Sequence, residues 1–358
     1  MPSLLDPIRL GALELPNRII MAPLTRARAT QDHVPTPLMA EYYAQRAGAG
    51  LIVSEAIGIS RGGLGWPNAA GLWSEAQVAG WRTVTDRVHD AGGRIVAQLW
   101  HMGRTVHPDY LDGAPPISAS ATVAPGRAYT YLGKKPYEAA RALDVSEIPT
   151  ILAEYQLATA NALRAGFDGV QIHAGNGYLI DQFLRDSTNR RTDDYGGTIS
   201  HRIRLLGDVA KAVIAVAGAA RTSVRISPNG DSQGVNDSDP EPLFVAVAQQ
   251  LSALGIGFLD IREPDFDGTF GQADRAPLAP AIRAAFVGPV VLNSDYDPAR
   301  AQSALDSGTA DAVEFGRLFI ANPDLVVRIA EGHALASPDP ATWYNGDGRG
   351  YTDYPTVG

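Results

Sequence analysis

The chain has 358 residues, with 45% apolar residues, 19% charged residues and no cysteine. The absence of cysteine excludes disulfides, thiolate metal sites and a cysteine nucleophile. The net charge of −9 disfavours nucleic acid and anionic membranes as partners, and the length suits either two ordinary domains or one barrel domain.

The N-terminus reads Met-Pro-Ser-Leu-Leu-Asp-Pro, with acid and proline where a secretory signal needs a basic start and an apolar run. The most apolar stretch, residues 212–220, is far shorter than the roughly 18 residues of a membrane-spanning helix. We therefore expect a cytoplasmic protein.

Eight short runs rich in Val and Ile follow one another along the chain, and each ends in a polar residue, Gly or Pro. This pattern is typical of strands buried on both faces. The predicted strands lie at 17–23, 50–56, 93–100, 167–173, 223–228, 258–263, 289–294 and 312–317.

Segments with apolar residues at helical spacing separate these runs, and helices are predicted at about 75–90, 146–165, 202–216 and 240–254. Asp297-Pro298 and Asn322-Pro323 each predict a further helix start, with a capping residue before a proline. Eight strands alternating with helices predict an α/β fold, a (β/α)8 TIM barrel. The alternative is an open doubly wound sheet, but no G-x-G-x-x-G sequence follows a strand.

Two segments break the alternation of strands and helices. Residues 101–145 separate the third strand from its helix and contain prolines, glycines and aromatic residues. A connection of that length is either functional or has small elements of its own, so we expect a capping insertion over the barrel mouth, with a short hairpin. We expect residues 338–358 to form a second covering segment, and the whole chain, 1–358, to form one domain.

Barrel enzymes carry their catalytic groups at the C-terminal ends of the strands. The residues at these positions are mostly neutral hydrogen-bonding groups and arginines, with few carboxylates. Such a set suits a bound organic cofactor better than a divalent metal. The strand ends place Pro23, Leu24, Thr25, Ala56, Gln98, Trp100, His173, Asn176, Arg225, Asn293, Gly316 and Arg317 in this region.

The stretch after the fourth strand is the most informative. His173 ends the strand, and two glycines then allow a tight turn that brings Asn176 and Tyr178 toward the same pocket. His and Asn can donate hydrogen bonds to a substrate oxygen, and a protonated Tyr can act as a general acid. A purely structural turn, with His173 bonded to backbone and Tyr178 packed under a helix, explains the spacing equally well.

Longer motifs are more specific. His173-x-x-Asn-Gly-Tyr-Leu179 is followed by Asp-Gln-Phe-Leu at 181–184 and by Asn-Arg-Arg-Thr-Asp-x-Tyr-Gly-Gly at 189–197. This ordered set resembles the signature of the old yellow enzyme family. The resemblance extends over nearly the whole chain, through 17–18, 22–25, 97–101, 315–325 and 350–355.

The resemblance implies a barrel with non-covalently bound FMN, which reduces activated C=C bonds of α,β-unsaturated carbonyl or nitro compounds with NADPH or NADH. In this ping-pong mechanism the flavin N5 delivers hydride to the β-carbon. His173 and Asn176 would bind the substrate oxygen, and Tyr178 would protonate the α-carbon. Thr25 stands where another branch of the family has cysteine, which implies the classical, threonine-type branch.

The same resemblance implies roles for individual residues. Gln98 would pair with the flavin pyrimidine, and Arg225 would lie by the N1–C2 region and stabilise the anionic reduced flavin. A strand-end arginine needs a partner anion, which argues against a purely structural role for Arg225. Asp295 departs from the glycines of many relatives, and its carboxylate would repel a phosphate unless turned away. The cofactor set is Pro23, Leu24, Thr25, Ala56, Gln98, His173, Arg225, Asn293, Ser294, Asp295, Gly316 and Arg317, and the substrate set is Thr25, Trp66, Trp100, His173, Asn176, Tyr178, Phe270 and Tyr351.

Other functions remain open from the sequence. The same fold could act mainly on nitrate esters or nitro compounds. A metal-dependent barrel hydrolase could use His101, His107 and His173, although strand-end carboxylates are scarce and no H-E-x-x-H sequence occurs. A non-catalytic flavin-binding protein is a third alternative. The expected partners are a small activated alkene and a nicotinamide nucleotide, with no nucleic acid or membrane, and the chain is expected to be a monomer or homodimer.

Overall fold

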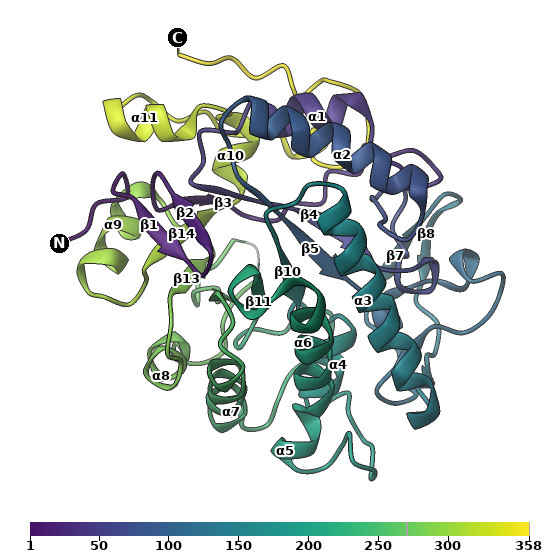
Figure 1. Cartoon of the computed structure of the whole chain (residues 1–358). Coiled ribbons are helices and arrows are strands. Elements are labelled where there is room, and N and C mark those ends of the chain that lie inside the picture. Colours follow the sequence, from purple (N-terminus) through teal and green to yellow (C-terminus); the bar gives the residue numbers. More distant parts are fainter. Residues whose placement is uncertain (270, 358) are drawn as a thin grey trace.

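The computed structural model describes residues 1–269 and 271–357, and its centre is a closed barrel of eight parallel strands (Figure 1). The predicted fold class and all eight predicted strands are confirmed. Each strand is buried along almost its whole length, because helices cover the outside and side chains fill the interior. Around the barrel the strands are β3 (Ile19–Met21), β4 (Leu51–Gly58), β5 (Ile95–Trp100), β10 (Gly169–His173), β11 (Thr222–Ile226), β12 (Phe258–Arg262), β13 (Val290–Asn293) and β14 (Ala312–Phe315).

Helices surround the barrel and alternate with its strands (Figure 1). The four helices predicted from periodicity are confirmed. The shorter helices lack a long apolar repeat, so periodicity does not reveal them. None of the described helices is long and apolar enough to cross a membrane. The helices are α1 (Pro37–Ala44), α2 (Glu75–Asp90), α3 (Ile148–Arg164), α4 (Leu179–Leu184), α5 (Ile199–Arg202), α6 (Arg204–Ala217), α7 (Pro240–Ala253), α8 (Ala279–Ala285), α9 (Pro298–Asp306), α10 (Arg317–Ala321) and α11 (Leu325–Glu331).

One of the two predicted helix starts is confirmed and the other is wrong. Asp297 caps α9, because its carboxylate accepts a hydrogen bond of 2.8 Å from the backbone N–H of Arg300. Asn322 instead follows α10, and α11 begins at Leu325 after Asp324. The Asn322 amide donates to the carbonyl of Ala336, so it ties the chain after α11 to the end of α10.

A short antiparallel hairpin closes the N-terminal end of the barrel. Its strands, β1 (Ile8–Leu10) and β2 (Leu13–Leu15), place Leu10 and Leu15 against the lowest layer of barrel side chains. Gly11 at the turn has a φ of 59°, and a Cβ there would lie 2.2 Å from the carbonyl oxygen of Ala220. The turn therefore requires glycine on both conformational and steric grounds.

The predicted hairpin in the insertion is present. Strands β7 (Arg127–Thr130) and β8 (Gly133–Pro136) pair antiparallel, while β6 (Ile117–Ser118) pairs with β9 (Arg141–Ala142). Tyr129 of the hairpin contacts Trp66 at a ring-centroid distance of 4.8 Å, and Tyr344 of the C-terminal segment contacts the same indole at 5.4 Å. The insertion and the C-terminal segment therefore meet at Trp66.

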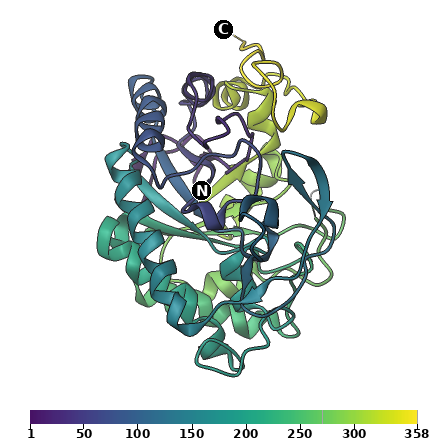
Figure 2. The same cartoon turned by 90° about the vertical axis from the view of Figure 1, so that its right-hand side faces the viewer.

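The last residues of the chain, in yellow, pass over the end of the molecule that carries α1 and α11 (Figures 1 and 2). Gln45 donates a hydrogen bond of 2.9 Å to the carbonyl of Thr352, and Arg328 donates one of 3.0 Å to the carbonyl of Pro355. These contacts fix the C-terminal segment against the helices that flank β3 and β14.

Candidate active site

A cavity of about 580 Å³ lies at the C-terminal ends of the barrel strands. It brings together every described residue of the predicted cofactor and substrate sets except Tyr351. The predicted residues that line it are Pro23, Leu24, Thr25, Ala56, Trp66, Gln98, Trp100, His173, Asn176, Tyr178, Arg225, Asn293, Ser294, Asp295, Gly316 and Arg317.

The prediction for Tyr351 is wrong, and Phe270 lies outside the described residues. Tyr351 is fully buried and stacks on Tyr42 with a ring-centroid distance of 4.0 Å. The guanidinium groups of Arg26 and Arg28 lie over the Tyr351 ring at 5.0 and 4.5 Å. Tyr351 thus holds the C-terminal segment onto α1 and does not line the cavity.

His173 ends β10 and is a neutral hydrogen-bond donor toward the cavity. Burial, with the charges of Arg225 and Arg262, holds the pKa of His173 well below its ordinary value. The backbone N–H of Gly175 donates to its Nδ1 at 3.4 Å. A neutral imidazole has one acceptor and one donor nitrogen, so the proton is on Nε2.

Asn176 presents its amino group to the same cavity. Its Oδ1 accepts a hydrogen bond of 2.8 Å from the hydroxyl of Ser227 and a longer one of 3.3 Å from Arg262. These donors fix the carbonyl side of the amide, so the NH2 group is the side that can serve a ligand. Asn176 has a φ of 58°, a left-handed conformation that Asn tolerates better than most residues.

Tyr178 stands beside this pair of donors. Its ring contacts Trp100 at 4.9 Å and His173 at 5.1 Å, both edge-on. Burial raises the pKa of Tyr178 above its ordinary value, and a hydrogen bond with Gln233 opposes this only in part. The phenol therefore keeps its proton at neutral pH and can act as a proton donor.

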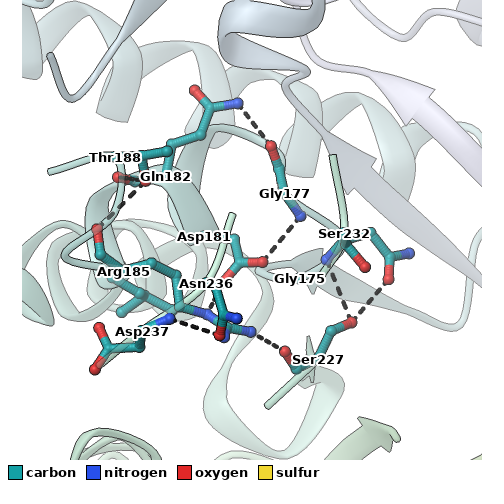
Figure 3. A network of polar contacts seen from close by, with 12 residues as sticks. Gly175, Gly177, Asp181, Gln182, Arg185, Thr188, Ser227, Ser232, Asn236 and Asp237 are labelled. Atoms are coloured by element: carbon teal, nitrogen blue, oxygen red, sulfur yellow. Dashed lines mark hydrogen bonds and ion pairs between the residues drawn. The ribbon is translucent and has the colours of Figure 1, made fainter. Parts of the chain in front are cut away.

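A buried polar network supports the turn from below (Figure 3). Asp181 and Arg185 form an ion pair of 2.9 Å in which both side chains are almost fully buried. Asp181 also accepts the backbone N–H of Gly177 at 2.9 Å, and Gln182 donates to the carbonyl of Gly177 at 2.8 Å. Arg185 also donates to the carbonyl of Ser227. This network joins the 175–178 turn to β11 and explains why the Asp-Gln pair follows Tyr178 so closely in sequence.

A chain of buried polar side chains links five strands of the barrel, and Gln98, Arg225 and Glu314 of this chain line the cavity. Gln98 donates to Gln171 at 2.7 Å, and Gln171 donates to Asp260 at 3.1 Å. Arg225 donates from one nitrogen to Asp260 at 2.6 Å and to Glu314 at 2.5 Å. The expectation that Arg225 needs a ligand anion as its partner is therefore wrong, because Arg225 already donates to two buried carboxyl groups of the protein.

The other end of the cavity carries the predicted phosphate-binding groups. Asp295 forms an ion pair with Arg317 and accepts two hydrogen bonds of 2.8 Å from Thr269, one backbone and one hydroxyl. These donors hold the Asp295 carboxylate and offset its negative charge. Such contacts are needed if Asp295 is to lie near a phosphate, because the two anions would otherwise repel each other. A Cβ at Gly316 would meet no protein atom closer than 3.4 Å, so packing within the chain does not explain this glycine.

The donor set fits FMN. An isoalloxazine needs an apolar wall and a polar pyrimidine edge, and its phosphate needs a cation and backbone N–H groups. Pro23, Leu24 and Ala56 can form the apolar wall, and the side chains of Gln98 and Arg225 can face the pyrimidine edge. The loop at Gly316 and Arg317 offers backbone N–H groups and a cation for the phosphate.

Several residues of the cavity were missed from the sequence. Arg262 ends β12, and burial together with the charge of Arg225 lowers its pKa to about 10. A charged residue inside an otherwise apolar strand was the available signal for Arg262 and Glu314. The same signal marks Asp260, which does not line the cavity but contacts Arg225. The others give no such signal; they are Ala22, Arg26, Thr269, Tyr296, Asp297, Phe315, Leu318, Ile320, Pro338, Trp343 and Tyr344.

The three histidines considered for a metal site do not form one. Burial lowers the pKa of His101 to about 4, and its Nδ1 accepts the N–H of Gly103 at 3.0 Å. His107 faces Asp109 and Glu138, both outside the cavity. Within residues 1–269 and 271–357, no group of three or more His, Cys, Asp or Glu side chains is arranged to hold a metal ion.

Comparisons with known proteins agree with this geometry. The sequence profile of the NADH:flavin oxidoreductase / NADH oxidase family matches residues 3–336. The structure of an old yellow enzyme homologue from Zymomonas mobilis shares 60% identity, with a TM-score of 0.98 and 99% of each chain covered. Morphinone reductase in complex with tetrahydroNAD shares 44% identity, with a TM-score of 0.95 over 100% of this chain and 98% of the other.

Curated relatives agree as well. A probable flavin mononucleotide-dependent alkene reductase from Leishmania infantum is 41% identical, over 98% of this chain and 97% of its own length. The 12-oxophytodienoate reductase 7 of Oryza sativa subsp. japonica is 40% identical, over 99% and 95%. The chain therefore belongs to the NADH:flavin oxidoreductase / NADH oxidase family, with the old yellow enzymes, and is an FMN-dependent oxidoreductase of the ene-reductase family.

Proposed function

We propose that this chain reduces the C=C bond of α,β-unsaturated carbonyl or nitro compounds with electrons from NADPH or NADH. The observation that carries the proposal is the arrangement on the turn after β10. Two neutral donors, His173 and Asn176, share the cavity with Tyr178, whose phenol is kept protonated. The two donors can stabilise a substrate oxygen that gains negative charge, and the phenol can protonate the adjacent carbon.

FMN, when bound, supplies the hydride chemistry that connects the nicotinamide nucleotide to the alkene. Gln98 and Arg225 would hold its pyrimidine edge, Thr25 its reactive edge, and Gly316 with Arg317 its phosphate. Ser294 and Asp295 would lie beside that phosphate, with Asp295 kept on Arg317 and Thr269. Thr25 at the cavity wall favours the threonine-type branch.

The donors of the turn act on the substrate oxygen. Because His173 is neutral, it offers Nε2–H without placing a full charge beside the guanidinium groups of Arg225 and Arg262. Hydrogen bonds from His173 and Asn176 strengthen as negative charge develops on the oxygen, so they favour the transition state over the ground state. Tyr178 then delivers its proton to the α-carbon.

Both substrates would use this cavity in turn. The structure of morphinone reductase with tetrahydroNAD shows a nicotinamide analogue bound to a relative of the same fold. Trp66 and Trp100 would form the apolar walls for the alkene. The insertion of residues 101–145 and the C-terminal segment meet at Trp66, which supports their proposed role as covers of the cavity.

The decisive experiment separates the two half-reactions. Purified holoprotein is reduced anaerobically with NADPH while the flavin absorbance is followed, and an enone, a nitroalkene or a nitrate ester is then added. We expect rapid reoxidation by the enone and nitroalkene with formation of the saturated product. Reoxidation by the nitrate ester alone would favour the alternative function, and no reoxidation by any of them would refute the proposal.

A further inference from the structure

Two buried carboxyl groups beneath the proposed flavin site have no role in the mechanism above. Asp260 lies on β12 and Glu314 on β14, and neither side chain is exposed. The same nitrogen of Arg225 donates to both, at 2.6 and 2.5 Å. Asp260 also lies directly opposite Arg225 in the register of β11 and β12.

The two carboxyl groups also lie close together, because one oxygen of each accepts a hydrogen bond from the same nitrogen of Arg225. Two ionised carboxylates held this close in a buried site repel each other, and one proton on the pair removes that repulsion. Asp260 Oδ1 and Glu314 Oε1 are buried and receive no donor from the described chain. One proton shared by the two groups supplies this buried pair with a donor of its own.

Electrostatics favours the same arrangement. Burial and the neighbouring charge of Asp260 raise the pKa of Glu314 well above its ordinary value. The groups that face the pair are Arg225, the amide of Gln171 and, through Arg225, the amide of Asn293. Among the described residues, Arg225 is the cation that forms an ion pair with both groups. One ionised carboxylate balances its charge, and a second would leave the cluster with a buried excess of negative charge.

We propose that Asp260 and Glu314 share one proton and together carry one negative charge, which balances Arg225 and sets the reduction potential of the bound flavin. Reduction adds negative charge to the isoalloxazine, and a positive Arg225 would stabilise that charge. Arg225 stabilises that charge less when the carboxyl pair already neutralises the guanidinium. The pair therefore keeps the reduction potential of the flavin low, which makes the reduced flavin a stronger reductant. The inference rests on the proposed placement of FMN beside Arg225.

Redox titration of the holoenzyme tests the proposal, with Asp260→Asn, Glu314→Gln and the double variant compared with the wild type. Each single variant keeps one ionised carboxylate and should leave the midpoint potential nearly unchanged. The double variant leaves Arg225 unbalanced and should increase the equilibrium constant for reduction at least tenfold, about 30 mV for a two-electron couple. Glu263→Gln removes a buried carboxylate that does not line the cavity, and serves as the control.

The pattern of the three shifts is diagnostic because it is non-additive. Equal stepwise increases in the two single variants would show two ionised carboxylates and would overturn the shared proton. An unchanged potential in the double variant would overturn the effect on the flavin. These potentials are measured without an alkene, so a failure of the proposed alkene reduction would not be confused with a failure of this inference.

Infrared spectroscopy tests the proton itself, even if the double variant does not fold. The wild-type spectrum minus that of either single variant should show the carbonyl stretch of one protonated carboxylic acid. The band should shift in deuterated water and have the same intensity for both variants. Its absence from either difference spectrum would contradict the shared proton.

Discussion

Replacing Tyr178 by phenylalanine removes the proposed proton donor and keeps the ring. The edge-on contacts with Trp100 and His173 at 4.9 and 5.1 Å remain, so the cavity wall is preserved. The hydroxyl also takes part in a hydrogen bond with Gln233. A neutral hydrogen bond contributes about 0.5–1.5 kcal/mol, which limits the non-chemical effect to roughly tenfold.

Loss of general acid catalysis is larger, about 10²–10⁴-fold. We therefore expect Tyr178→Phe to leave flavin reduction by NADPH within about tenfold of the wild type and to slow alkene reduction by more than 100-fold. Anaerobic stopped-flow measurements of the two half-reactions give both rates.

The matched control is Tyr155→Phe, which removes a fully buried hydroxyl that has no hydrogen-bond partner among the described residues and does not line the cavity. It should change neither half-reaction. A slowing of alkene reduction by Tyr178→Phe of tenfold or less would show that the proton comes from elsewhere, since loss of the hydrogen bond alone would account for it.

Three further predictions concern binding and stability. His173→Ala or Asn176→Ala should weaken binding of a phenol by about 10–100-fold, because each removes a donor worth about 1.5–3 kcal/mol to a charged oxygen; titration of the flavin spectrum measures this, and equal affinities would refute it. Arg185→Met leaves Asp181 buried without its ion-pair partner and should lower the free energy of unfolding by about 3–5 kcal/mol in urea titrations, whereas a loss below about 1 kcal/mol, as for surface pairs, would contradict the burial of the pair. Burial raises the pKa of Glu55 to about 7, so its contribution to stability is present at low pH and is lost as pH rises from about 4.5 through 7. Glu55→Gln should therefore stabilise the protein above pH 7 by roughly 3 kcal/mol and flatten this part of the pH profile, and parallel profiles for variant and wild type would argue against it.

The sequence predicts the barrel because each strand is a compact apolar run that is buried on both faces. The strands of the N-terminal hairpin, β1 and β2, have only three residues each, too few to show a period. Helix α8 has seven residues and escaped notice for the same reason. Short elements are fixed by their tertiary contacts, such as those of Leu10 and Leu15 with the barrel interior.

The candidate site shows the same difference between local sequence patterns and contacts made only in the folded chain. His173, Asn176 and Tyr178 were found because they lie within six residues on one turn. The partners of Arg225 were not found, because Asp260 and Glu314 lie on two other strands, far from it in sequence. They contact Arg225 only in the folded barrel. Tyr351 shows the opposite error, since an aromatic residue in a glycine-rich tail has the same sequence appearance whether it faces a ligand or stacks on Tyr42.

The hairpin of β1 and β2 has a kinetic consequence. Leu10 and Leu15 close the N-terminal end of the barrel against its lowest layer of side chains, so ligands have access to the cavity only from the C-terminal end. If the nucleotide and the alkene bind in the same cavity, each can also bind the form of the enzyme that reacts with the other. The alkene then blocks the oxidised enzyme, and the nucleotide blocks the reduced enzyme. Excess alkene then acts as a competitive inhibitor of the nucleotide, and the steady-state rate passes through a maximum as the alkene concentration increases.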